Sequence, residues 1–196
     1  MKEVTKTYTV YEFNELSEEA KEKAFNWLYG DIVEDRFTFF EEDCYNILDE
    51  VYGIKPSRLH YSFSNSQGDG LSFDCDNLIS GKVLDLIKAS DKVSQATKDN
   101  IIRLQDALEV KTLNESRYTY HHRNQVNVYL SNDYDGLVPD FIMDDIRKAF
   151  EDVYIKIAKE LEDNGHRFNN VTLEDVAEYA EIMTLDFYIN GDIFNE

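Results

Sequence analysis

Alternating apolar and polar positions predict the β-strands of this chain. Two such runs, residues 57–63 and 71–75, flank the turn Gln67-Gly68-Asp69-Gly70. Successive side chains of a strand point to opposite faces, so the two runs predict a β-hairpin around this turn. Residues 117–122 and 125–131 repeat the pattern and predict a second hairpin.

Apolar residues that recur every three or four positions predict the helices, because this spacing gathers them on one side of a 3.6-residue turn. Ser17 is placed to cap the first helix, and Thr172, three residues before Asp175, to cap the last. Gly30 and the pair Asn164-Gly165 are predicted helix ends. The predicted helices cover residues 17–30, 34–51, 139–164 and 172–183, with two shorter helices within 81–108.

These elements predict an α+β fold. Two further strands are expected near the chain ends, over residues 5–13 and 185–189. Because the hairpins are local, the sheet should be mostly antiparallel, with amphipathic helices covering one of its faces. We expect one α+β domain over residues 1–196, with a helical excursion at 81–116.

The charge of the chain narrows the classes of partner. Forty Asp and Glu residues against twenty Lys and Arg give a formal net charge of −20, while 13 Tyr and 12 Phe supply enough apolar area for a folded core. Such a surface repels phosphates, so we expect no direct nucleic-acid binding and no membrane binding. Without a secretion signal or an apolar span, the expected location is cytoplasmic, and Cys44 and Cys75 are expected to be buried thiols.

One short motif could bind a small ligand. Ser66, Gln67, Gly68, Asp69 and Gly70 form a turn whose backbone N–H groups could hold an anion, while Asp69 could hold a metal ion or a ribose. The turn lacks the Lys and the following helix of a phosphate-binding loop. A tight hairpin turn that needs positive φ is the favoured interpretation.

Other candidate chemistry is weaker. Residues 132–136 (NDYDG) resemble the start of a calcium loop, but Ile142 occupies the position of the closing glutamate. Asp74 and Asp76 could pair for acid–base chemistry, but without a partner base they are expected to keep a sheet edge solvated. His60 has no companion histidine and is expected to be a hydrogen-bonded or surface histidine. The chain carries no catalytic triad, HExxH motif or dinucleotide fingerprint, so we expect no catalytic residues, no metal site and no cofactor.

Acidic helix surfaces are the preferred candidate site. Carboxylates beside tyrosine rings suit an arginine-rich surface on another protein, and a net charge of −20 exceeds the magnitude of about 2–8 that solubility requires. The alternative is that these surfaces are only solvated helix faces. The expected partner-binding residues lie on one helix and near the start of another: Glu34, Asp35, Glu41, Glu42, Asp43, Asp133, Asp135, Asp140, Asp144 and Asp145.

Three segments carry a resemblance to a known group of proteins: YEFNELSEEAKEKA from Tyr11, YSFSNSQGDGLSF from Tyr61, and FYINGDIF from Phe187. They resemble a poorly characterised family of acidic proteins encoded by phages and mobile elements. That family is similar in character to inhibitors of host defence nucleases, including anti-CRISPR proteins and other DNA mimics.

The resemblance implies a phage protein that acts in the cytoplasm of the infected bacterial host. It would inhibit a host nuclease, such as a CRISPR effector, by covering a basic nucleic-acid-binding surface, and a homo-oligomer is compatible with this role. The alternative function is a small nucleotide- or metal-binding module, or an enzyme, that uses the turn at residues 66–70.

Overall fold

The structure, a computed structural model, describes residues 5–63, 68–114, 125–131 and 137–195. It has an α+β fold in which a four-stranded antiparallel sheet of order β1-β2-β3-β4 is combined with helices, as the sequence predicts. The chain divides into two compact units, a finer division than the single domain expected. Unit 1 contains Met1–Phe39 and Phe168–Glu196, and unit 2 contains Phe40–Arg167. Among the described residues, no helix combines the length and apolar composition needed to cross a bilayer.

The sheet belongs to unit 2. Its strands are β1 (Pro56–Ser62), β2 (Gly70–Cys75), β3 (Leu108–Thr112) and β4 (Val126–Leu130). β1 and β2 form the first predicted hairpin. β4 pairs antiparallel with β3, a strand that the sequence pattern missed because Leu108 continues the apolar spacing of the preceding helix. The other predicted strand of the second hairpin, residues 117–122, lies outside the described residues.

Helices α3 (Gly81–Ala89) and α4 (Gln95–Leu104) confirm the two short helices expected within residues 81–108. The side chain of Ser80 caps α3 by accepting the N–H of Val83. Ser94 caps α4 in the same way, by accepting the N–H of Thr97.

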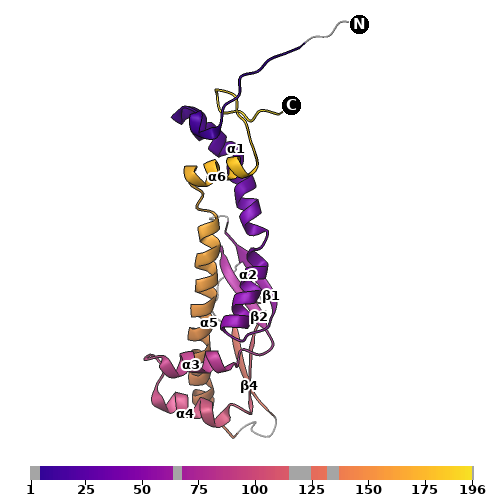
Figure 1. Ribbon diagram of the computed structural model, residues 1–196. Helices are drawn as coiled ribbons and strands as arrows, with labels where there is room; N and C mark the ends of the chain where they lie inside the picture. The colour runs from indigo at the N-terminus through magenta and orange to yellow at the C-terminus, as the bar shows by residue number, and fades with distance from the viewer. Residues whose placement is uncertain (1–4, 64–67, 115–124, 132–136, 196) are drawn as a thin grey trace. The chain divides into compact units, whose positions relative to one another are not determined.

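The long helix α5 (Asp140–Phe168) runs alongside the strands in Figure 1. It buries five residues completely: Ile146, Phe150, Tyr154, Ile157 and Leu161. The spacing of these residues confirms the predicted amphipathic helix and its covering of one sheet face, where the Tyr154 ring lies 4.7 Å from that of Phe73.

The predicted end of this helix at Asn164-Gly165 is wrong. α5 continues to Phe168, and Gly165 is buried against the ring of Phe63. A Cβ at position 165 would collide with that ring. The glycine therefore allows a close approach of helix and sheet and does not end the helix.

The predicted boundary at Gly30 is also wrong. Helix α1 extends from Glu18 to Phe37, and Gly30 lies exposed within it. The single helix predicted over residues 34–51 is in fact divided. α1 ends at Phe37 in unit 1, whereas α2 (Phe40–Asn46) and a π-helical turn, η2 (Ile47–Val51), belong to unit 2.

Unit 1 contains the 3₁₀ helix η1 (Phe13–Glu15), α1 and α6 (Leu173–Ile182). Its core is formed by one stripe of α1 packed with residues of the chain ends: Phe13, Leu16, Ala20, Ala24, Leu28, Ile32, Val171, Val176, Ala180 and Phe187. The predicted caps are confirmed, because Ser17 accepts the N–H of Ala20 and Thr172 accepts that of Asp175. The strands predicted over residues 5–13 and 185–189 are reduced to isolated bridges at Phe187, with Tyr11 and with Ile193.

Candidate functional site

The first candidate surface is the acidic segment, which we define as Glu41, Glu42, Asp43, Asp49 and Glu50 of α2 and η2. All five residues are exposed, and the sequence has no lysine or arginine between Arg36 and Lys55. Within the described part of the chain, none of the five forms an ion pair. The acidic segment therefore carries five carboxylates without an ion pair among the described residues, and Arg58 is a cation close enough to oppose the rise in the pKa of the neighbouring Tyr45.

The opposite side of this helix anchors it to the core of unit 2. Phe40, Cys44 and Leu48 recur every four residues and are each no more than 1% exposed. The ring of Phe40 packs edge-on against that of Tyr61 in β1, with the centroids 5.1 Å apart. Because these contacts fix the helix, the carboxylates on its outer side are attached to a rigid backbone.

Two groups beside the acidic segment have raised pKa values. Burial raises the pKa of the Cys44 thiol to about 12, with smaller contributions from the negative charges of Asp43 and Glu41. Burial likewise raises the pKa of Tyr52, whose hydroxyl donates a 2.6 Å hydrogen bond to Glu160 on α5. Both groups therefore remain neutral at physiological pH.

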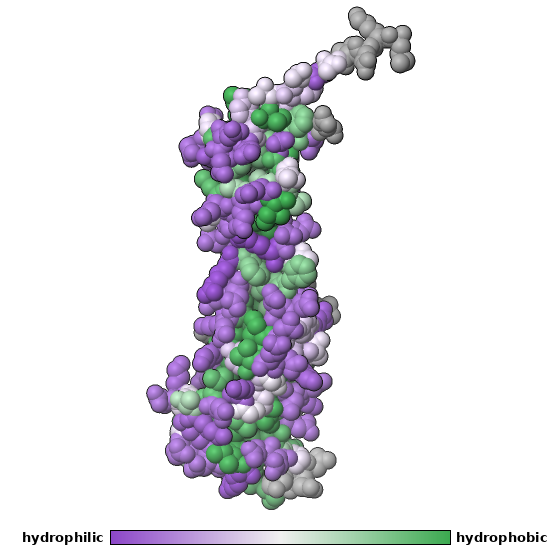
Figure 2. Space-filling view, viewed as in Figure 1, coloured by the Kyte–Doolittle hydropathy of each residue, from purple (hydrophilic) through white to green (hydrophobic). Residues whose placement is uncertain are grey.

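The carboxylates of the acidic segment form two groups along the helix axis. Glu41, Glu42 and Asp43 are consecutive, and Asp49 and Glu50 follow after five uncharged residues. At about 1.5 Å per residue, neighbours within a group are about 1.5 Å apart along the axis and the two groups about 9 Å apart, so the segment does not repeat the spacing of about 3.4 Å between phosphates of one B-DNA strand. The face of the molecule visible in Figure 2 is predominantly hydrophilic, with smaller hydrophobic patches.

The remaining predicted partner residues lie elsewhere. Glu34 and Asp35 are exposed near the end of α1 in unit 1. The prediction that they share one helix with Glu41, Glu42 and Asp43 is therefore wrong.

Asp140, Asp144 and Asp145 are exposed in the first turns of α5. Asp144 lies 3.8 Å from Arg147, and Asp145 lines a cavity that Lys92 and Lys148 also line. This group therefore includes an ion pair, unlike the acidic segment. Asp133 and Asp135 lie outside the described residues.

The turn considered for ligand binding is only partly described, since Ser66 and Gln67 fall outside the described residues. Gly68 and Gly70 have φ values of 106° and 147°, which is the backbone conformation expected of a glycine turn. Asp69 accepts a 2.7 Å hydrogen bond from the Ser62 hydroxyl, so one of its oxygens is engaged within the hairpin. These contacts favour the interpretation of this segment as a hairpin turn.

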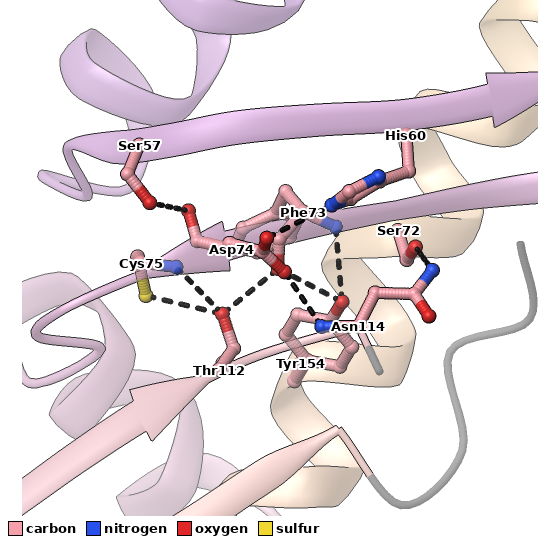
Figure 3. Close-up of polar contacts among 9 residues, drawn as sticks. All are labelled: Ser57, His60, Ser72, Phe73, Asp74, Cys75, Thr112, Asn114 and Tyr154. Atoms are coloured by element: carbon pink, nitrogen blue, oxygen red, sulfur yellow. Dashed lines mark hydrogen bonds and ion pairs between the residues drawn. The ribbon is translucent and has the colours of Figure 1, made fainter. Parts of the chain in front are cut away.

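A polar cluster that the sequence did not predict lies where β2 meets β3 (Figure 3). Within the described residues, the two strands are paired at a single register position, Cys75 opposite Thr112. Side chains bond the remaining backbone groups of buried β2. The Thr112 hydroxyl accepts a 2.9 Å hydrogen bond from the N–H of Cys75 and donates one of 2.8 Å to the carbonyl of Phe73. The Tyr154 hydroxyl accepts a 3.0 Å hydrogen bond from the N–H of Phe73 and donates one of 3.1 Å to its carbonyl.

On the other side of β2, Asp74 is the centre of a second set of bonds. Its carboxylate contacts His60 Nε2 at 2.8 Å and accepts the N–H of Asn114 at 2.7 Å. Asn114 also donates from its side chain to the Ser72 hydroxyl at 2.7 Å. The expectation of a solvated Asp74 is therefore wrong, because the hairpin register brings it next to His60 and buries it to 8% exposure. His60 is hydrogen-bonded, which is one of the two environments expected for it.

The described bonds of this cluster link β2 to β1 and to the end of β3. The Ser72 hydroxyl bonds Asn114, while His60 bonds Asp74, so the described contacts do not form a serine–histidine pair of the kind used in nucleophilic catalysis. Across the described ranges, no three His, Cys, Asp or Glu residues are grouped to hold a metal ion.

Comparison with protein families, with curated proteins and with solved structures finds no match to this chain. The proposals below therefore rest on the residues and geometry of the chain itself.

Proposed function

We propose that this chain is an interaction protein whose acidic segment binds a cationic surface of a partner protein, at a place where that partner otherwise binds nucleic acid. The observation that supports it is the group of five exposed carboxylates on α2 and η2, which form no ion pair among the described residues. Carboxylates would take the place of phosphates in the complex.

Electrostatics then controls recognition. Exposed charges of one sign attract a cationic partner over roughly a Debye length, about 10 Å at 0.1 M salt and about 3 Å at 1 M salt. Association should therefore be fast at low ionic strength and slow steeply as salt is added. A partner held by apolar contacts would lose much less affinity to salt.

Apolar groups beside the acidic segment can add affinity. Tyr45 is half-buried at the edge of α2, and its hydroxyl is hydrogen-bonded to Glu41; burial first and the Glu41 charge next raise its pKa. Val51, at the end of η2, is 51% exposed. A cationic side chain that reaches the carboxylates would pack its aliphatic stem on these groups.

The partner class follows from the resemblance to acidic phage proteins. On that basis we propose a host defence nuclease, such as a CRISPR effector, as the target, with inhibition by occupation of its nucleic-acid channel. This places the chain in the cytoplasm of an infected bacterium.

Charge reversal of the acidic segment tests the binding surface. The variant carries Glu42→Lys, Asp43→Lys, Asp49→Lys and Glu50→Lys. With about 0.7 kcal/mol for each reversal, within the range of exposed ion pairs, binding to the cationic partner weakens about a hundred-fold. The control variant makes the same change in net charge at four exposed aspartates of α3, α4 and their flanking turns: Asp85, Asp91, Asp99 and Asp106.

The measurement is capture of proteins from bacterial lysate on the immobilised chain, with and without competing duplex DNA, followed by cleavage assays of the captured nuclease. We expect DNA to displace the partner, and only the acidic-segment variant to lose capture and inhibition. Equal losses in the two variants, or a partner that excess DNA does not displace, would refute the proposal. Circular dichroism checks that both variants fold.

A further inference from the structure

Unit 1 contains a cavity of about 340 Å³ between η1 and the C-terminal end of α6. Its lining comes from two chain segments that the Tyr11–Phe187 bridge holds together. The lining residues are Glu12, Phe13, Asn14, Ala177, Ala180, Glu181, Thr184, Leu185 and Asp186. The volume lies at the lower end of the range of small-ligand sites, roughly 300–1,000 Å³.

The wall of this cavity is amphiphilic. Phe13, Ala180 and Leu185 are buried or half-buried and supply an apolar side. Glu181 and Asp186 are exposed and supply carboxylates. An apolar wall beside negative charge matches the long side chains of basic residues, whose aliphatic stem and cationic head need these two environments.

Three cations of unit 1 form ion pairs away from the cavity. Lys23 pairs with Asp192 at 2.7 Å, and Arg36 pairs with Asp175 at 2.6 Å. Lys21 pairs with Glu18 at 3.3 Å. Among the described residues, no ion pair neutralises the carboxylates at the cavity.

The last carbonyls of α6 are bonded within the turn that follows it. The carbonyls of Tyr179 and Glu181 accept the N–H groups of Met183 and Thr184. Past the helix, Thr184 adopts a left-handed conformation, φ 52°, and the N–H of Leu185 bonds the carbonyl of Ala180 at 2.8 Å. This closed turn fixes Asp186 beside the helix end before any ligand arrives.

We propose that this cavity binds the arginine side chain of a peptide or protein segment, independently of the acidic segment of unit 2. The guanidinium bonds the carboxylates of Glu181 and Asp186, and its methylene stem packs on Phe13 and Leu185. Arginine fits better than lysine because its planar group can donate to two carboxylates at once. The described residues contain no group of three ligands suited to a metal ion, so the argument does not extend to metals.

The test uses the full chain labelled with ¹⁵N and the peptide acetyl-Gly-Arg-Gly-amide. We expect saturable shifts of the amide signals of Glu181, Leu185 and Asp186. The same peptide with citrulline, which keeps the shape of arginine and removes its charge, should bind at least ten-fold more weakly.

Two double variants with equal change in charge separate the cavity from general electrostatics. Glu181→Gln with Asp186→Asn should weaken arginine-peptide binding at least ten-fold. Glu174→Gln with Glu178→Gln, on exposed positions of the same helix, should change it less than two-fold.

Equal binding of the arginine and citrulline peptides would overturn the proposal, as would shifts confined to other regions or no shift at 20 mM peptide. Should the cavity variant fail to fold, the comparison of the two peptides on the unaltered chain still decides the question. None of these measurements involves the acidic segment, so the result is separate from that of the proposed function.

Discussion

Replacing Tyr154 by phenylalanine tests the side-chain bonds that join β2 to β3. The change keeps the ring, which is completely buried, and removes only the hydroxyl that bonds the N–H and the carbonyl of Phe73. The carbonyl retains its bond from Thr112, whereas the buried N–H loses its partner. An unsatisfied buried donor costs about 1–3 kcal/mol, so we expect Tyr154→Phe to lower the free energy of unfolding by about 2 kcal/mol.

Urea denaturation measures this loss, and native-state hydrogen exchange locates it at the Phe73 amide. The matched control is Tyr29→Phe, since the Tyr29 hydroxyl also donates to a backbone carbonyl, that of Asn169, but at the surface of unit 1. We expect the control to change stability by less than about 0.5 kcal/mol. A loss below about 0.5 kcal/mol for Tyr154→Phe, or unchanged protection of the Phe73 amide, would show that the Tyr154 hydroxyl is not the hydrogen-bond partner of this amide.

Three further predictions concern other parts of the chain. Gly165→Ala should destabilise unit 2 by about 1–2 kcal/mol in urea, because a Cβ there collides with Phe63; a stability gain, as expected for alanine in an open helix, would contradict the packing. Burial raises the pKa of Cys44 from 9.0 to about 12 in the folded state. The contribution of this thiol to the free energy of unfolding is therefore complete below pH 9 and is lost as the pH rises toward 12. The urea midpoint should therefore fall more steeply above pH 9 in the unaltered chain than in Cys44→Ala, and parallel curves would argue against a protonated thiol. Thr172→Ala should lower the free energy of unfolding by about 1 kcal/mol, because it removes the cap of α6. It should also raise the pKa of Asp175, which the Thr172 hydroxyl lowers, and NMR titration of the carboxylate measures this change. An unchanged pKa would mean that the cap does not form in solution.

Local patterns predicted the elements that depend on local contacts. The first hairpin, the caps Ser17 and Thr172, and the amphipathic α5 follow from alternation, from hydroxyl side chains before a helix and from 3.6-residue periodicity. Glycines within helices were misleading. Gly165 is required by its contact with Phe63, which directly follows β1, and such a contact is not visible in the sequence near position 165.

Long-range pairing explains the features of the candidate sites that the sequence could not predict. β3 was missed because its pairing with β4 is decided by residues about twenty positions away. The contact between His60 and Asp74 depends on the register of the first hairpin, which periodicity alone does not set. The acidic segment could be predicted in part. Glu41, Glu42 and Asp43 were among the predicted partner residues, because they lie next to a buried four-residue repeat, whereas Asp49 and Glu50 of η2 were not.

The pairing of β2 with β3 has a consequence for how the molecule unfolds. β1 pairs with β2 along its length, with one register shift near Pro56, and β3 pairs with β4 at five positions. The described contacts between β2 and β3 instead depend on the side chains of Thr112, Tyr154 and Asp74, beside the single pair of Cys75 and Thr112. A rotation of one of these side chains releases backbone groups that no adjacent strand can recapture. The two hairpin-like halves should thus separate here first, and mechanical or thermal stress would split the sheet between them before either half melts.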